Sequence, residues 1–281
     1  MLIEEVLAQA TRRLTNENVE SPQWDAELLL AHVLETNRAQ ILAWPDRQLT
    51  PKQLTRFREL VARRGEREPL AYIIAYREFF GLEFTVDSRV LVPRPETELL
   101  VERALDIARE MAAPLHIADV GAGSGAIAVS LAVHLPQAVI YALDESANSL
   151  IIVAENARRH GVSDRIQCLA GDLLDPLPER VRLITANLPY VTTAEWRDLA
   201  PEIRDHEPRA ALDGGPDGLA LIRRLLATAA PHLLPGGALL LEIGASQGAA
   251  AMALARQHFS AAKVRLYKDY AGLDRVVAIR T

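Results

Sequence analysis

The tetrapeptide Asn187-Leu188-Pro189-Tyr190 directly follows the apolar run 181–186 and has residue types that suit methyl transfer to a planar nitrogen. An amide or amino nitrogen on an sp2 centre is a weak nucleophile because its lone pair is delocalised, so a site must hold its N–H groups and its π face. The Asn187 side-chain oxygen can accept, Tyr190 can stack, and Pro189 restricts the turn. Asn and Pro are equally common in ordinary turns, so the motif alone leaves both interpretations open.

A glycine-rich segment lies between a predicted strand at 117–120 and an apolar segment that follows it. Its members are Gly121, Ala122, Gly123, Ser124 and Gly125. Glycine allows a ligand to lie close to the backbone at the start of a helix. In a dinucleotide-binding turn the third glycine falls one residue later, where this chain has Ala126. The spacing therefore indicates an adenosine-containing cofactor without deciding which one.

Two acids extend this predicted cofactor site. Asp144 ends the next predicted strand, where its carboxylate can accept both ribose hydroxyls, a role that NAD and S-adenosylmethionine share. Asp172 follows the third strand and is placed to meet an adenine amino group, with Leu173 packing on the ring, although a capping role for Asp172 fits equally well. A dehydrogenase has no need for the motif at Asn187, so the sequence favours S-adenosylmethionine.

Composition restricts the class of protein. The chain has 281 residues, of which 49% are hydrophobic and 24% charged, which predicts a globular fold with one large or two ordinary domains. The net charge of −6 argues against direct binding of nucleic acid through phosphate contacts. The single cysteine, Cys168, excludes an intramolecular disulfide and a Cys-based zinc site, and its apolar neighbours predict that it is buried.

Metal, membrane and export signals are not found in the sequence. The seven histidines lack ligand spacing, so no metal is predicted. No apolar run is long enough for a membrane span, and the first residues do not have the layout of a signal peptide. We therefore expect a cytoplasmic protein without a membrane partner.

The first part of the chain reads as short helices at 2–14 and 24–34 and after Thr50-Pro51, with a further N-cap predicted at Ser21-Pro22. The third helix separates an apolar face from a set of cations, which we interpret as a solvated face rather than a binding patch. These cations are Lys52, Arg56, Arg58, Arg63 and Arg64.

The periodicity changes after this helical part. Aromatic and β-branched residues at 69–92 predict a β-hairpin or an extended linker, and a proline-braced loop at 93–98 leads into a helix at 99–111. Strands then alternate with helices, which predicts a parallel sheet with helices on both faces. The predicted strands are 117–120, 138–143, 166–169, 181–186 and 238–243, followed by antiparallel runs at 264–268 and 275–279. This doubly wound, Rossmann-like α/β arrangement resembles class I S-adenosylmethionine methyltransferases.

Several motifs, spread over nearly the whole chain, resemble the PrmC (HemK) family of protein-(glutamine amide nitrogen) methyltransferases. The most specific is the loop Leu91-Val92-Pro93-Arg94-Pro95-Glu96-Thr97-Glu98, which generic methyltransferases lack. The other motifs are Pro69-Leu70-Ala71-Tyr72-Ile73, the turn at 121–125, Asn187 to Tyr190, His206-Glu207-Pro208, Asp217-Gly218-Leu219, Glu242-Ile243-Gly244 and Gly272-Leu273-Asp274-Arg275.

The chain departs from this family at Leu188, because the usual tetrapeptide is Asn-Pro-Pro-Tyr. The form found here resembles that of rRNA adenine dimethyltransferases, which makes amino-group methylation of rRNA an alternative. The acidic charge, the loop at 91–98 and a helical domain that precedes the catalytic one argue against it. A second alternative is a catalytically silent module that binds S-adenosylmethionine, in which Leu188 marks lost activity.

The resemblance implies methylation of the glutamine in the Gly-Gly-Gln motif of peptide chain release factors. It implies a helical substrate-recognition domain at 1–76, a β-hairpin linker at 77–95 and a methyltransferase domain at 96–281. We expect the protein to be a monomer. Asn187 and the Leu188 carbonyl would accept the amide hydrogens, Pro189 would shape the pocket, and Tyr190 would pack on the glutamine. Asn187 would also adjoin the cofactor. For Glu207 two interpretations stay open: a residue at the substrate entrance, or a loop carboxylate in a salt bridge.

Overall fold

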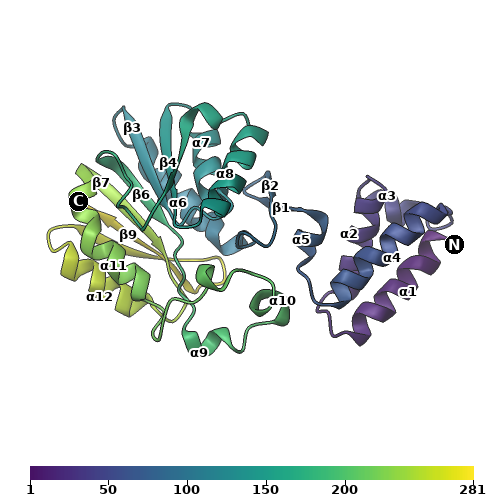
Figure 1. Ribbon diagram of the computed structural model, residues 1–281. Coiled ribbons are helices and arrows are strands. Elements are labelled where there is room, and N and C mark those ends of the chain that lie inside the picture. The colour runs from purple at the N-terminus through teal and green to yellow at the C-terminus, as the bar shows by residue number, and fades with distance from the viewer. The chain divides into compact units, whose positions relative to one another are not determined.

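The computed structural model describes residues 1–281, which form two compact units (Figure 1). One unit comprises Met1–Tyr76 together with Ala200–His206, and the other comprises Arg77–Leu199 together with Glu207–Thr281. The chain therefore passes between the units three times. None of the helices combines the length and the apolar character that crossing a membrane requires.

The first unit is helical, as its sequence periodicity predicts. Its helices are α1 (Ile3–Asn16), α2 (Pro22–Val33), α3 (Arg38–Ala43), α4 (Pro51–Gly65), α5 (Leu70–Ile74) and α10 (Pro201–Arg204). Thr50 caps α4 by accepting from Gln53 N at 3.3 Å, and the Gln53 side chain accepts from Thr50 N in return. Ser21 occupies the predicted N-cap position of α2, but its side chain makes no capping hydrogen bond.

The cations of α4 do not all lie on a solvated face. Arg64 is only 6% exposed, and it donates to Asp25 Oδ2 at 2.7 Å and to Glu202 Oε1 at 2.9 Å. Arg67 donates to Glu202 Oε2 at 2.6 Å. The prediction of a solvated face is therefore wrong for Arg64, because an acid of α2 and one of α10 compensate its charge. We call Asp25, Arg64, Arg67 and Glu202 the Glu202 cluster.

The segment at 69–92 is only partly extended. Pro69 precedes the helical turn α5, and Ala75 ends this turn in a left-handed conformation. The apolar run at 71–74 is buried throughout, a pattern that does not distinguish a helical turn from a strand. The predicted hairpin follows as β1 (Tyr76–Phe79) and β2 (Leu82–Thr85), whose connecting residues Phe80 and Gly81 both have positive φ.

The second unit contains a seven-stranded sheet with the order β5-β4-β3-β6-β7-β9-β8. Its strands are β3 (Leu115–Val120), β4 (Ala138–Asp144), β5 (Ile166–Ala170), β6 (Val181–Ala186), β7 (Leu233–Glu242), β8 (Lys263–Lys268) and β9 (Asp274–Arg280). Strands β3 to β7 are parallel, whereas β9 runs antiparallel to β7 and to β8. The predicted strands are all present, although β7 begins at Leu233, earlier than predicted.

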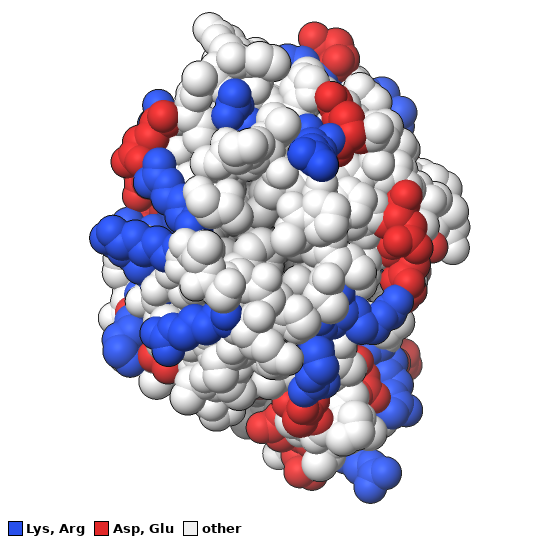
Figure 2. Space-filling model, turned by 90° about the vertical axis from the view of Figure 1, so that its left-hand side faces the viewer, with Lys and Arg blue, Asp and Glu red and all other residues white.

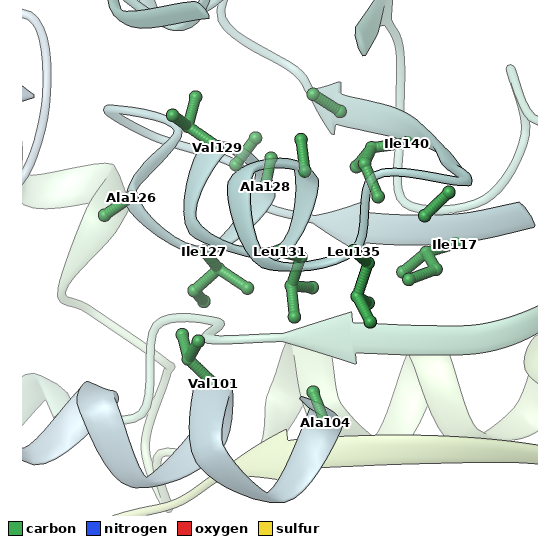
Figure 3. Close-up of a cluster of buried hydrophobic side chains, with 14 of the residues drawn as sticks. Val101, Ala104, Ile117, Ala126, Ile127, Ala128, Val129, Leu131, Leu135 and Ile140 are labelled. Atoms are coloured by element: carbon green, nitrogen blue, oxygen red, sulfur yellow. The ribbon is translucent and has the colours of Figure 1, made fainter. Parts of the chain in front are cut away.

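Helices cover both faces of this sheet (Figure 1). The helices of the second unit are α6 (Glu98–Arg109), α7 (Ala126–His134), α8 (Ala147–Arg159), α9 (Thr193–Trp196), α11 (Ala220–Ala229) and α12 (Gly248–His258). Apolar residues of α6, α7 and α8 form one core with the sheet, and those of α11 and α12 form the other. Figure 3 shows Val101 of α6 pointing toward Ile127 of α7 in the first core. This packing holds the ends of β3, β4 and β6 in fixed positions.

Cys168 is exposed, so the prediction that it is buried is wrong. It lies on β5, the edge strand of the sheet, where Gln167 and Ala170 are exposed as well. Apolar neighbours in the sequence do not bury a residue on an edge strand, because such a strand has a neighbour on one side only.

Candidate active site

A cavity of about 260 Å³ opens at the carboxyl ends of the parallel strands, within the second unit. This is where ligands bind in open α/β sheets. The cavity brings together most of the predicted site residues: Gly121, Ala122, Gly123, Ser124, Asp144, Asp172, Leu173, Asn187, Leu188 and Pro189. Gly125 and Tyr190 are not among its lining residues. Residues Arg89, Val90, Leu91, Pro93, Arg94 and Thr97 form a further part of its wall.

The glycine turn after β3 is held by the neighbouring strand. The N–H groups of Gly121 and Ala122 both donate to the Leu143 carbonyl, at 2.8 and 2.9 Å. Gly121 has φ of 75° and Gly123 of 54°, in the region that favours glycine. Gly125 acts differently: a Cβ atom there would lie 3.2 Å from Val153 Cγ1, so this glycine permits α8 to pack closely.

Asp144 faces the same turn. Its Oδ2 accepts from Gly123 N at 2.9 Å, and its Oδ1 accepts from Ser146 N at 2.9 Å. Each carboxylate oxygen has a further lone pair, so the group can still accept hydroxyl hydrogens from a ligand in the cavity. The geometry therefore fits the ribose-binding role predicted for Asp144.

Asp172 lines the cavity with Leu173, which has a left-handed φ of 46°. The Asp172 side chain forms an ion pair with Arg224 and makes no capping hydrogen bond. The capping interpretation is thus not observed. Contact of Asp172 with an adenine ring stays a prediction.

The Asn187 side chain has a defined partner. Its Nδ2 donates to Thr97 Oγ1 at 3.1 Å, which leaves Oδ1 as the free acceptor of the amide. The Leu188 carbonyl accepts no hydrogen bond from the protein. Asn187 Oδ1 and the Leu188 carbonyl, from consecutive residues that line the cavity, are therefore both available as acceptors.

Tyr190 is held behind this turn. Its hydroxyl donates to Glu242 Oε1 at 3.1 Å, and its carbonyl accepts from Gln247 Nε2 at 2.9 Å. Burial, more than the nearby Glu242 charge, raises the pKa of Tyr190 well above its usual range. Tyr190 is not among the residues that line the cavity, and its stacking on a substrate stays a prediction.

Glu242, which accepts from Tyr190, is a buried acid with 1% exposure. Burial raises its pKa to about 7, against the lowering effects of hydrogen bonds from Thr97 and Tyr190 and of the Arg275 charge. Its Oε2 has no close hydrogen-bond partner, which adds to the cost of ionisation. Thr97, itself 4% exposed, hydrogen-bonds to Asn187 and lies close enough to Glu242 to lower its pKa.

Glu207 forms a buried salt bridge and does not line the cavity. It accepts from Arg94 Nη2 at 2.6 Å and from Val92 N at 3.1 Å. Burial raises the pKa of Glu207, while the Arg94 charge lowers it. Of the two interpretations the salt bridge is the one observed, and it fixes the loop that forms part of the cavity wall.

Three residues of this site had no role in the sequence analysis: Thr97, Glu242 and Gln247. The first two belong to motifs that carried the family resemblance, so a signal was present, but their contact with Asn187 or Tyr190 is not visible in one sequence. Gln247 belongs to none of these motifs, so the sequence did not indicate a role for it.

Comparison with known proteins assigns the family. A release factor glutamine methyltransferase of Moorella thermoacetica is 43% identical to this chain over 276 residues, which cover 98% of this chain and 97% of the relative. The chain belongs to the release factor glutamine methyltransferase family. A member from Geobacter sulfurreducens is 41% identical, covering 99% of this chain and 96% of its own length. The resemblance found in the sequence is thereby confirmed.

Domain families agree with this assignment, and a solved structure shares the fold. The PrmC N-terminal domain matches residues 5–74, and the methyltransferase small domain matches residues 96–210. A methyltransferase structure from Pyrococcus furiosus is 17% identical and superposes with a TM-score of 0.55, covering 78% of this chain and 98% of that one. At this identity the likeness concerns the fold alone. The predicted fold class is confirmed.

Proposed function

We propose that this protein methylates the side-chain amide nitrogen of the glutamine in the Gly-Gly-Gln motif of a peptide chain release factor, with S-adenosylmethionine as methyl donor. Membership of the family over nearly the full length supports this assignment. The observation that carries it is the pair of free acceptors, Asn187 Oδ1 and the Leu188 carbonyl, at the wall of a cavity bounded by the glycine turn and Asp144.

The residues at the cavity fit the proposed donor. The positive φ of Gly121 and Gly123 allows a ligand close to the backbone, and Asp144 retains acceptor capacity toward a ribose. Asp172 and Leu173 would adjoin the adenine ring. When bound, S-adenosylmethionine supplies an electrophilic methyl carbon on its sulfonium.

The substrate nitrogen would be held by the turn after β6. Asn187 Oδ1 and the Leu188 carbonyl would accept its two hydrogens, which aims the lone pair and favours a change from planar toward tetrahedral. Positioning of reactants supplies roughly 7–11 kcal/mol of barrier reduction, so no strong base is needed. The nitrogen would gain a bond to the methyl carbon as the carbon–sulfur bond of the donor breaks, and the sulfur would keep that electron pair as a neutral thioether. The nitrogen would lose one proton, which water can take.

We also propose that the helical residues 1–76 bind the release factor and that 77–95 forms a wall of the pocket. Arg89, Val90 and Leu91 support the second part because they line the cavity. A monomeric state and a cytoplasmic location stay predictions.

The face of the molecule in Figure 2 has cations and anions around a broad uncharged area, which does not favour a phosphate backbone on that side.

A labelled methyl donor distinguishes the proposed function from rRNA methylation. Purified release factor or ribosomal RNA is incubated with the protein and methyl-labelled S-adenosylmethionine. Label in the glutamine peptide supports the proposal, whereas label only in RNA adenine contradicts it. Donor binding without either product would support the silent module.

Asn187→Ala tests the mechanism in the same assay. We expect turnover to fall by roughly two to three orders of magnitude, the effect of losing one well-placed polar group, while the dissociation constant of the donor changes little. Asn148→Ala serves as the control, because Asn148 is exposed on α8 and does not line the cavity. A rate near that of the wild type in Asn187→Ala would contradict the mechanism.

A further inference from the structure

Asn187, Thr97, Glu242 and Tyr190 form one chain of polar contacts. Asn187 Nδ2 donates to Thr97 Oγ1 at 3.1 Å, and Tyr190 donates to Glu242 Oε1 at 3.1 Å. The Thr97 side chain lies close enough to Glu242 to lower the pKa of that carboxyl. Thr97 ends a short 3₁₀ helix at Pro95–Thr97, and Glu242 ends β7. Residues from distant parts of the chain thus meet behind the Asn187 side chain.

The chain of contacts has a direction. A terminal amide can present either its oxygen or its NH2 group to a ligand, and the two orientations occupy nearly the same space. A threonine hydroxyl has a single hydrogen, and an ionised carboxylate can only accept. When Glu242 is ionised and Thr97 gives its hydrogen to this nearby carboxylate, the Thr97 oxygen is left to accept from Asn187 Nδ2. The oxygen of Asn187 must then face the cavity.

Burial makes this direction effective. Thr97 is 4% exposed and Glu242 is 1% exposed, so water does not replace a lost partner easily. The charged and polar groups that act on Glu242 are Thr97, Tyr190, Arg275 and Glu96. Reversal of the Asn187 amide would place its NH2 group against the N–H groups of the substrate and leave the Leu188 carbonyl as the one acceptor of the pair.

We propose that Thr97 and Glu242 are positioning residues that fix the orientation of the Asn187 amide, so that its oxygen meets the substrate nitrogen. This inference rests on the proposed function and adds to it two residues that need not touch the substrate.

Thr97→Val and Thr97→Ser form a matched pair for the test. Valine keeps the size of the side chain but removes the hydroxyl, whereas serine keeps the hydroxyl. We expect Thr97→Val to lower kcat by roughly tenfold to a hundredfold, the scale of a misplaced contact, with the donor dissociation constant unchanged. Thr97→Ser should recover most of kcat. Glu242→Gln should also lower kcat, because glutamine can donate as well as accept.

A double-mutant cycle separates positioning from a general structural role. If Thr97 acts through Asn187, then Thr97→Val has no further effect on kcat in the Asn187→Ala background. An equal fold-loss in both backgrounds, or a kcat of Thr97→Val within twofold of the wild type, overturns the inference. Thermal unfolding of each variant verifies that it is folded.

NMR of the Asn187 side-chain NH2 group tests the contact without turnover. Its resonance, assigned by its loss in Asn187→Ala, should shift in Thr97→Val and stay near the wild-type position in Thr97→Ser. No shift in Thr97→Val overturns the inference even if the release factor is methylated. Failure of the wild type to methylate any release factor would instead overturn the proposed function, so the two failures are distinguishable.

Discussion

Leu188 packs against Gly121 so closely that a Cβ atom at position 121 would lie 3.1 Å from Leu188 Cδ2. The Leu188 side chain is 4% exposed. The turn proposed to hold the substrate and the turn proposed to hold the donor therefore share a packed contact. The residue by which this chain departs from the usual Asn-Pro-Pro-Tyr pattern is the one that makes it.

Gly121→Ala should weaken donor binding. The added methyl group would press on Leu188, and a left-handed φ of 75° costs an alanine about 1–2 kcal/mol. We expect the dissociation constant of S-adenosylmethionine, measured by calorimetry, to rise about tenfold or more. Gly161→Ala is the matched control: its φ is 67° and nothing lies within 4 Å of the new atom. Equal donor affinity in both variants would show that the contact does not matter.

Leu188→Pro restores the usual tetrapeptide of the family. The Leu188 N–H donates no backbone hydrogen bond, so proline removes none. Loss of the buried side chain should lower the free energy of unfolding by about 1–2 kcal/mol, as judged by urea denaturation. The fall in kcat should be far smaller than in Asn187→Ala, because the carbonyl at position 188 is kept. A fall as large as that of Asn187→Ala would mean that the leucine itself is required for turnover.

Asp119 predicts an unusual dependence of stability on pH. Burial is the main cause that raises its pKa from 3.8 to about 7, with a smaller contribution from the Asp144 charge and opposing hydrogen bonds from Thr185 and Ala128 N. Between these pH values the folded protein keeps a proton that the unfolded chain releases. Stability from this group is therefore present below about pH 4 and is lost as the pH rises to 7.

Asp119→Asn should remove that dependence. Over the same window the wild type should lose up to about 4 kcal/mol of unfolding free energy relative to the variant. Urea denaturation at pH 4, 5, 6, 7 and 8 measures both proteins. Parallel curves would contradict the raised pKa.

The Glu202 cluster should stabilise the helical unit. Glu202→Ala leaves the buried Arg64 with Asp25 as its one remaining carboxylate partner and should lower the unfolding free energy by about 2 kcal/mol, between the values for exposed and buried pairs. Asp205→Ala, in the same segment, breaks an exposed pair with Arg204 and should leave stability almost unchanged. Circular dichroism melting of both variants makes the comparison. Similar melting temperatures would indicate that Arg64 finds another partner.

The sequence predicted those features that depend on neighbouring residues. The apolar runs of β3, β4 and β6, the glycines of the cofactor turn and the acceptor types at Asn187 are local properties. The hydrogen bond between Asn187 and Thr97 joins residues 90 positions apart, a contact that depends on the tertiary fold. Arg64 shows the same limit, because its acidic partners lie on α2 and α10. Cys168 shows another, since strand composition did not reveal that β5 is an edge.

The repeated passage of the chain between its two units constrains how the protein can be taken apart. A deletion that ends at residue 76 would remove Arg64 and Arg67 while keeping Glu202, so the remaining fragment would carry an acid without its cations. The helical unit therefore cannot be exchanged as one continuous segment of the chain. A chimaera that takes its helices from a relative has to carry residues 200–206 of that relative as well.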